Sequence, residues 1–143
     1  MREAIGNSFL TYMVIIFTFL ILGFLVASFS YSKAFKVKNK IINTVEKYNG
    51  FTDKAQEEIR TDLLAMGYNL NSNYFSCSTK NNATLLYGNV KGQYHYCLYE
   101  RSTSRGKYYE VISYMHFDIP VIGEKISVPV HGESRIIYQD LKG

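Results

Sequence analysis

The N-terminal part of the sequence lacks charge, since no charged residue lies between Glu3 and Lys33. The chain also lacks proline before residue 120, so no proline interrupts a helix there. Within this stretch residues 9–29 are predominantly apolar. At about 1.5 Å per helical residue they match the roughly 30 Å of hydrocarbon in a bilayer. These absences predict one membrane-spanning helix.

Two other kinds of apolar segment compete with a membrane span. A secretory signal peptide has an apolar core of about 7 to 15 residues after a basic start, whereas here Arg2 is followed directly by Glu3; only the small residues Ala27 and Ser28 favour a cleavage site. A buried core helix fails because a domain this small cannot surround a helix that is apolar on every side. We therefore expect residues 9–29 to stay in the membrane.

Cysteine is scarce as well. Cys77 and Cys97 are the only two, so a single intramolecular disulfide is the one internal bridge that the chain can form. Closing a loop of this length would stabilise a small domain by about 3 kcal/mol in the chain-entropy model. Two reduced, buried cysteines are the alternative. The choice bears on location, because disulfides persist in oxidising compartments.

Positive charge follows the apolar segment directly, in a cluster of four lysines: Lys33, Lys36, Lys38 and Lys40. A cluster at this place indicates a membrane boundary and lipid contact, and nothing else indicates nucleic-acid binding. Taken alone, the positive-inside rule places the following domain in the cytoplasm. A disulfide and loops rich in asparagine and tyrosine favour the opposite side. We expect a single-pass protein of the cell membrane whose C-terminal domain is extracytoplasmic, at the cell surface.

The helix is expected to continue beyond the membrane. Apolar residues recur at helical spacing after the lysine cluster begins: Ala34, Val37, Ile41, Val45 and Tyr48. Gly50 follows as a C-terminal cap. The chain therefore divides into a transmembrane helix over residues 1–31, an amphipathic continuation over 32–49 and a small α+β domain over 50–143.

That domain is predicted to hold one more helix and then a sheet. The helix begins at Thr52 or Asp53 and ends at Gly67. Short runs rich in Tyr, Val and Ile then predict strands over residues 84–87, 94–100, 108–117, 126–130 and 135–138, with a hairpin loop over 101–107. Pro129 indicates an edge strand. The expected fold class is α+β, with a small antiparallel sheet.

Residues that could carry chemistry are few. His95 and Cys97 form an H-x-C pair, but its spacing is not that of a zinc motif, and a bridged Cys97 would have no thiolate for nucleophilic attack. The acidic residues of the strand region come singly, and no glycine-rich phosphate loop is present. The sequence predicts a protein that is not an enzyme and has no cofactor and no metal.

Two groups of residues suit contacts with other chains. Small residues near the end of the apolar segment would let another helix approach closely: Gly23, Ala27 and Ser28. The chain has thirteen tyrosines and no tryptophan, and amphipathic rings suit both a half-exposed sheet and a protein interface. The tyrosines of the strand region are therefore either sheet packing or a partner surface: Tyr94, Tyr96, Tyr99, Tyr108 and Tyr109.

Two stretches carry a family resemblance: SFLTYMVIIFTFLILGFLVASFSYSKAFKVKNKII near the start and FDIPVIGEKISVPVHGES near the end. With them the chain resembles type IV pilin-like proteins, and most of all the TadE-like minor pilins of tight-adherence pilus systems. The resemblance implies a long N-terminal helix packed on a small antiparallel sheet. One feature departs from the prepilin pattern, because Gly6 is followed five residues later by Thr11 where prepilins have Glu.

The resemblance also implies a role without catalysis. Such a protein would be a membrane-anchored structural or assembly subunit of a pilus-like surface appendage. Its partners would be membrane lipid and either other pilin-like subunits or pilus assembly platform proteins. The alternative is a monomeric, membrane-tethered binding or sensor module that works outside the cell.

Overall fold

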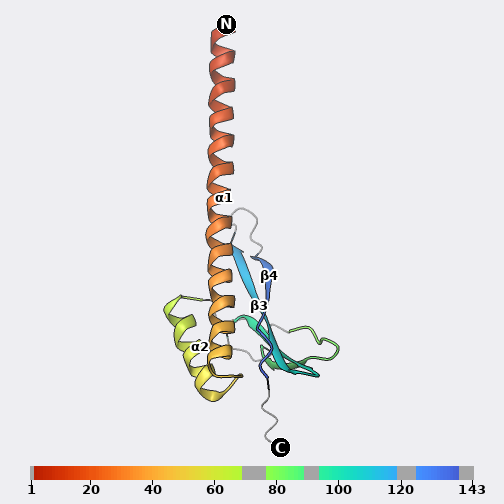
Figure 1. The fold of residues 1–143 in the computed structure, drawn as a ribbon. Helices are drawn as coiled ribbons and strands as arrows, with labels where there is room; N and C mark the ends of the chain where they lie inside the picture. The colour runs from red at the N-terminus through yellow and green to blue at the C-terminus, as the bar shows by residue number, and fades with distance from the viewer. Residues whose placement is uncertain (1, 69–76, 89–93, 119–124, 139–143) are drawn as a thin grey trace, which may run out of the picture.

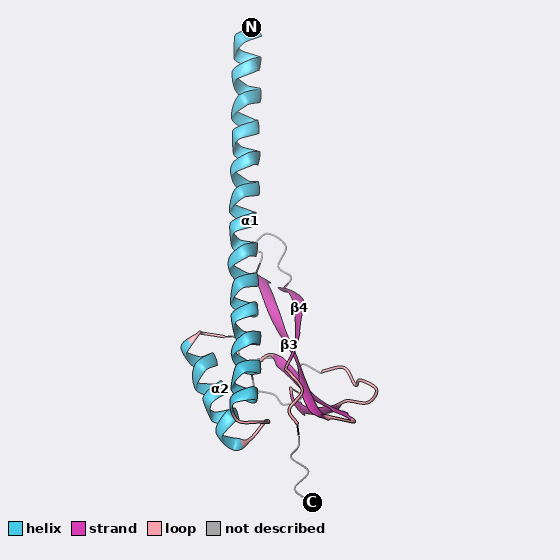
Figure 2. Ribbon diagram, viewed as in Figure 1, coloured by secondary structure: helices cyan, strands magenta, loops and turns pink. Residues whose placement is uncertain are grey.

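A computed structural model describes residues 2–68, 77–88, 94–118 and 125–138 (Figure 1). Within these residues two helices precede a four-stranded antiparallel sheet (Figure 2): α1 (Arg2–Lys47), α2 (Asp53–Ala65), β1 (Thr84–Tyr87), β2 (Tyr96–Thr103), β3 (Gly106–Asp118) and β4 (Lys125–Glu133). The strands lie in the order β1-β2-β3-β4, each paired with the next along the chain. The α+β fold class predicted from the sequence is confirmed.

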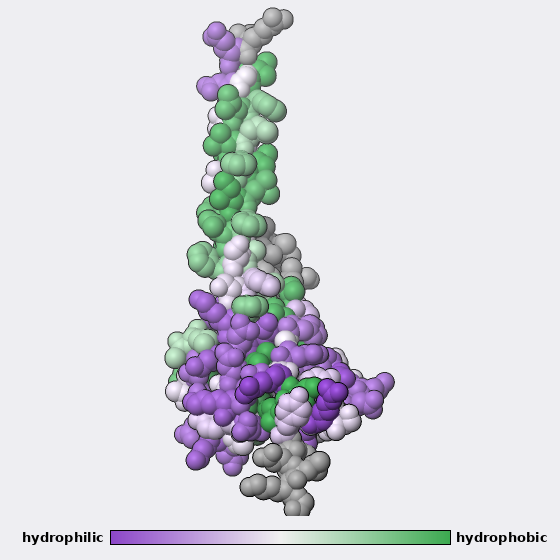
Figure 3. Space-filling view, in the orientation of Figure 1, coloured by the Kyte–Doolittle hydropathy of each residue, from purple (hydrophilic) through white to green (hydrophobic). Residues whose placement is uncertain are grey.

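Helix α1 is unbroken from its apolar first half to its amphipathic second half. Among the described residues it is the one helix long and apolar enough to cross a membrane, and Figure 3 shows its bare, hydrophobic N-terminal half standing clear of a largely hydrophilic domain. The hydroxyls of Ser8, Thr11 and Thr18 each donate to the carbonyl oxygen four residues earlier, at 2.8–3.0 Å. These polar groups therefore need no partner from the surroundings.

The end of α1 is fixed by backbone hydrogen bonds. Asn49 has a φ of 53°, and the N–H of Gly50 donates to the carbonyl oxygen of Val45 at 2.9 Å. This is the bond expected of a Schellman cap, whose left-handed residue favours Gly or Asn. The helix thus ends close to the predicted Gly50, with Asn49 taking the left-handed position.

Helix α2 runs back along α1 in the opposite direction (Figure 1). Its first turn is capped by Thr52, whose hydroxyl accepts from the N–H of Ala55 at 3.3 Å, and Gly67 follows its end with a φ of 60°. Both predicted ends are confirmed. Side-chain contacts then join the two helices in antiparallel order: Lys47 with Glu58, Lys40 with Asp62, and Lys33 with the carbonyl oxygen of Gly67.

The hairpin loop predicted over residues 101–107 is wrong, because β2 and β3 continue through most of it. Thr103 pairs directly with Gly106, which leaves a two-residue turn. The hydroxyl of Thr103 closes this turn by donating to the carbonyl oxygen of Gly106 at 2.9 Å. The final predicted strand is also shorter than expected, since only an isolated bridge joins Ile137 to Lys107.

The start of β2 differs from the prediction for a physical reason. The Tyr68 hydroxyl donates to the carbonyl oxygen of His95 at 2.7 Å and accepts from the N–H of Tyr114 at 3.0 Å. It occupies the place where the β2–β3 ladder would otherwise close, so regular pairing begins at Tyr96. At the other side of the sheet, Pro129 lies in β4, which pairs only with β3, and its predicted edge position is confirmed.

The main core lies between α1 and the sheet, with α2 against the other side of α1 (Figure 2). Its fully buried side chains come from both helices and from β2 and β3: Val37, Ile41, Val45, Ile59, Leu63, Tyr96, Leu98 and Val111. Alternate residues of β2 and β3 form a second cluster on the far face of the sheet with Cys77: Cys97, Tyr99 and Ile112. The sheet is therefore covered on both faces at β2 and the adjoining part of β3, whereas the outer face of β4 is exposed.

Candidate functional site

Three of the four predicted juxtamembrane lysines hold the domain against α1. Lys33 Nζ donates to the carbonyl oxygen of Gly67 at 2.7 Å, and Lys40 Nζ lies 3.3 Å from a carboxylate oxygen of Asp62. Lys38 Nζ lies 4.1 Å from the ring centroid of Phe35, within cation–π range. Its stem lies so close to β4 that a Cβ on Gly132 would collide with it. Lys36 is exposed.

The three small residues predicted for helix packing do not share one face. At 3.6 residues per turn, Gly23 and Ala27 lie on the same side of α1, whereas Ser28 lies about 100° away. Gly23 has open space around it, with no atom within 4 Å of an added Cβ. Ala27 is partly buried, on the face that continues to the buried Ala34. Contact of Gly23 and Ser28 with a neighbouring helix stays a prediction.

The predicted disulfide joins Cys77 to Cys97. Both half-cystines are buried, and the bridge fastens the segment before β1 across the outer face of β2. Two further contacts hold the same segment: the Tyr99 hydroxyl donates to the carbonyl oxygen of Ser78 at 2.6 Å, and Lys80 forms an ion pair with Glu110. This segment is thus part of the folded domain.

Four of the five tyrosines predicted as a partner surface are buried in the protein's own core: Tyr94, Tyr96, Tyr99 and Tyr109. Tyr96 stacks on Tyr87 with ring centroids 4.2 Å apart, and burial raises its pKa well above the usual value. For these four the partner-surface prediction is wrong, because their side chains belong to the two buried clusters and are packing residues. Tyr108 alone is half-exposed.

A buried carboxylate that the sequence did not indicate lies on the outer face of the sheet. Glu110 of β3 has a side chain only 8% exposed, and it pairs with Lys80 and with Arg101 of β2, the latter at 3.1 Å. His131 Nδ1 of β4 lies 3.7 Å away. Burial acts to raise the pKa of Glu110, but the hydrogen bond and charge of Lys80, together with Arg101, outweigh it and lower the pKa. Side chains from the segment before β1, from β2 and from β4 thus meet at the carboxylate of Glu110.

Glu110→Gln should lower the free energy of unfolding by about 1–2 kcal/mol at neutral pH, since two cations lose their buried partner. A lowered pKa in the folded state gives stability that is present above the unfolded value of about 4.3 and is lost as the pH falls through the folded one. The wild type should therefore lose more stability than Glu110→Gln on acidification below that value. Urea titrations at a series of pH values measure both effects. Glu57→Gln, on the exposed face of α2, is the matched control, and equal pH slopes for wild type and Glu110→Gln would contradict the assignment.

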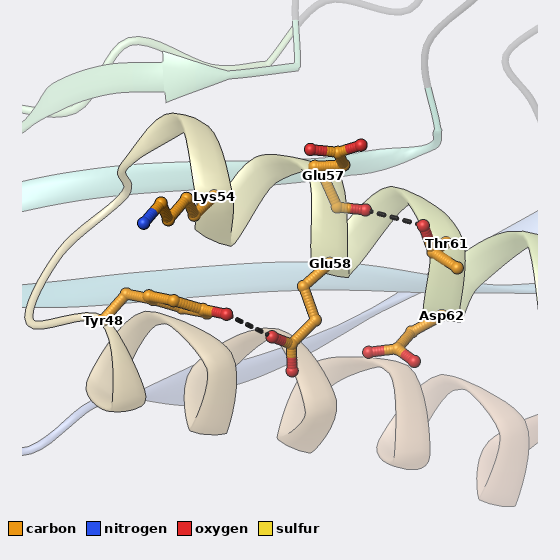
Figure 4. A pocket seen from close by; sticks show the side chains of 6 residues that line it. All are labelled: Tyr48, Lys54, Glu57, Glu58, Thr61 and Asp62. Atoms are coloured by element: carbon orange, nitrogen blue, oxygen red, sulfur yellow. Dashed lines mark hydrogen bonds between the residues drawn. The ribbon is translucent and has the colours of Figure 1, made fainter.

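A shallow pocket lies where the end of α1 meets α2, and three of its six lining residues are acidic (Figure 4). Glu58 accepts hydrogen bonds from Lys47 at 2.9 and 3.1 Å and from the Tyr48 hydroxyl at 2.8 Å. The hydrogen bond from Lys47, and next that from Tyr48, lower the pKa of Glu58. Its carboxylate thus joins the two helices.

The described residues contain no group of three His, Cys, Asp or Glu placed to hold a metal ion. His95, considered as a zinc ligand from the sequence, stacks on the ring of Tyr114 at a centroid distance of 4.6 Å. Two features of the described residues stand out: one continuous helix with an exposed apolar half, and a domain packed on its other half. Compared with known proteins, the chain matches no family model, no curated protein and no solved structure.

Proposed function

We propose that the protein is a membrane-anchored, non-catalytic structural or assembly subunit of a pilus-like surface appendage, similar in role to TadE-like minor pilins. The observation that carries the proposal is the continuity of α1. Its first half exposes large apolar side chains, such as Phe17 (65%) and Leu20 (66%), whereas Val37, Ile41 and Val45 of its second half are buried in the core. The anchor and the domain form one rigid part. Such a part is suited to fix the position of a displayed sheet relative to a membrane or a helix bundle.

The extracytoplasmic location belongs to the same proposal. The Cys77–Cys97 disulfide supports it, because such bridges persist in oxidising compartments. The lysine cluster, which by itself favours the cytoplasmic side, is largely engaged by the domain: Lys33 and Lys40 bind to α2 and the residue after its end, and the stem of Lys38 packs on β4. A membrane helix retained after export would hold the domain at the outer surface.

Photo-crosslinking through α1 tests the assembly role. A photoreactive amino acid at Leu20, which is exposed in the isolated chain, should yield adducts with other pilin-like subunits or assembly platform proteins in intact cells, because a bare apolar helix packs against its neighbours. Mass spectrometry of the adducts identifies them. The same probe at Ser28, on another face of α1, shows whether one face is preferred. Recovery of the monomer alone, without adducts and in gentle detergent, would favour the tethered binding or sensor module.

A further inference from the structure

The sheet extends along α1 toward its apolar half, further than it would need to if the whole domain were held away from the membrane. Strands β3 and β4 run beside α1 toward its apolar half (Figure 1). The buried Ser113 hydroxyl donates to the carbonyl oxygen of Ala34 at 2.9 Å, which fixes Ser113 of β3 at the level of Ala34. From there β3 continues to Asp118, which pairs with Lys125 at the start of β4.

A strand rises further per residue than a helix does, and this difference determines how far β3 extends along α1. Five strand residues from Ser113 to Asp118 cover about 16 Å. Five helical residues from Ala34 back to Phe29, the end of the apolar segment, cover only about 7.5 Å. Even if β3 were inclined by about 40° to α1, it would advance about 12 Å. The strand ends therefore pass the level of Phe29.

The burial pattern of α1 gives a second, independent observation. From Glu3 to Lys33 every described residue is exposed except Ala27 and Ser30, which are partly buried. These two lie three residues apart, and Ala34, four residues further, is fully buried, so all three lie on the face of α1 turned toward the sheet. The face of α1 that is turned toward the sheet is thus partly covered as far as Ala27, which lies within the apolar segment.

The chemistry at this level suits lipid headgroups. Tyr31 and Phe35 are exposed by 52% and 41%, as aromatic residues at a membrane interface commonly are, and the exposed Lys33 and Lys36 occur in the same turns of α1. On β4 the apolar Val128 is 37% exposed.

We infer that the membrane-proximal parts of β3 and β4, from the Met115–Val128 pair to the Asp118–Lys125 pair, form a second membrane contact, which rests in the headgroup region of the same bilayer that α1 crosses. The occupant of this surface is lipid, because the hairpin reaches past the end of an apolar segment whose length matches the hydrocarbon. Two attachments, a helix and a hairpin, fix the tilt and rotation of the domain on the membrane. The inference uses only the membrane-anchor part of the proposed function and does not depend on assembly.

The absence of tryptophan makes a direct test available, because one introduced tryptophan is a unique fluorescent reporter. Val128 pairs with Met115, two residues past Ser113, which places it near the level of Ser30. The full chain carrying Val128→Trp is reconstituted in vesicles of brominated phosphatidylcholine and compared with the same chain in unbrominated vesicles. We expect about a twofold loss of its fluorescence. Ser127→Trp, on the opposite face of β4, is a second reporter in case the first substitution disturbs the fold.

Two control variants distinguish a membrane contact of the hairpin from anchoring by α1 alone. Ile16→Trp reports the centre of the apolar segment and should be quenched more strongly. Tyr138→Trp lies near Arg135, which pairs with Glu46 at the opposite end of α1, and should not be quenched. If both β4 reporters behave like Tyr138→Trp while Ile16→Trp is quenched, the hairpin inference is overturned and the anchor stands. If Ile16→Trp is not quenched either, the membrane anchor itself is overturned, and the hairpin contact with it.

Discussion

A chain carrying both Cys77→Ala and Cys97→Ala should unfold with a free energy lower by about 3 kcal/mol than that of the wild type, because the disulfide no longer restricts the unfolded state. The bridge spans a sequence separation of 20 residues and fastens the segment that also supplies Ser78 and Lys80 to the outer face of the sheet. Since whole domains of this size are stable by only about 5–15 kcal/mol, the loss is large. Urea titration of the full chain in mild detergent, followed by near-ultraviolet circular dichroism of the tyrosines, measures it.

The reduced wild type is the natural control for this variant. A reducing agent should bring the wild-type unfolding midpoint close to that of the double variant and should leave the double variant unchanged. Agreement between the two would assign the effect to the covalent link and not to the lost sulfur atoms of two buried side chains. A double variant as stable as the oxidised wild type would contradict the role given to the bridge.

Local sequence patterns predicted the elements whose periodicity is complete within themselves. The spacing of Val37, Ile41 and Val45 predicted the buried face of α1, and the structure buries all three. Thr52 and Gly67 marked the ends of α2 through cap chemistry, which involves only neighbouring residues. The fold class followed, because a long helix, a short helix and several short strands leave few arrangements.

The features that escaped prediction depend on residues far apart in the sequence. Tyr68 shifts the start of β2 by bonding to His95 and Tyr114, which lie 27 and 46 residues away. Glu110 meets Lys80, 30 residues away, in a run of strand residues that carries no sign of a buried charge. Sequence periodicity cannot indicate such long-range contacts, because each partner has the local sequence pattern of an ordinary surface residue.

The tyrosines show the same limit at the candidate partner surface. Tyr96 and Tyr99 lie on opposite faces of β2, and the sequence could not tell which face of the sheet would stay open. At β2 both faces are covered, one by α1 and the other by the segment bridged through Cys77, so neither ring reaches solvent. The disulfide pair was predictable because the chain has two cysteines, but the surface that it covers was not.

Gly88→Ala is the substitution with the other large expected effect. Gly88 has a φ of 134°, and a Cβ there would collide with Cys77 Sγ and lie 2.8 Å from the carbonyl oxygen of Tyr96. Backbone strain and overpacking together should lower the free energy of unfolding by about 3–5 kcal/mol. The same urea titration measures the change. Gly67→Ala is the matched control, because Gly67 also has a positive φ, 60°, but open space around it, so only about 1–2 kcal/mol of backbone strain is expected.

The two large effects are coupled, and the coupling tests the geometry more closely than either does alone. In the Cys77→Ala, Cys97→Ala background the sulfur that blocks a Cβ on Gly88 is gone, so Gly88→Ala should cost less there than in the wild type. It should still cost more than Gly67→Ala, because the carbonyl oxygen of Tyr96 belongs to the backbone of β2 and stays in place. Equal penalties for Gly88→Ala in both backgrounds would show that the bridge does not press on this glycine. The glycine and the disulfide would then hold the outer face of the sheet independently, rather than as one packed unit.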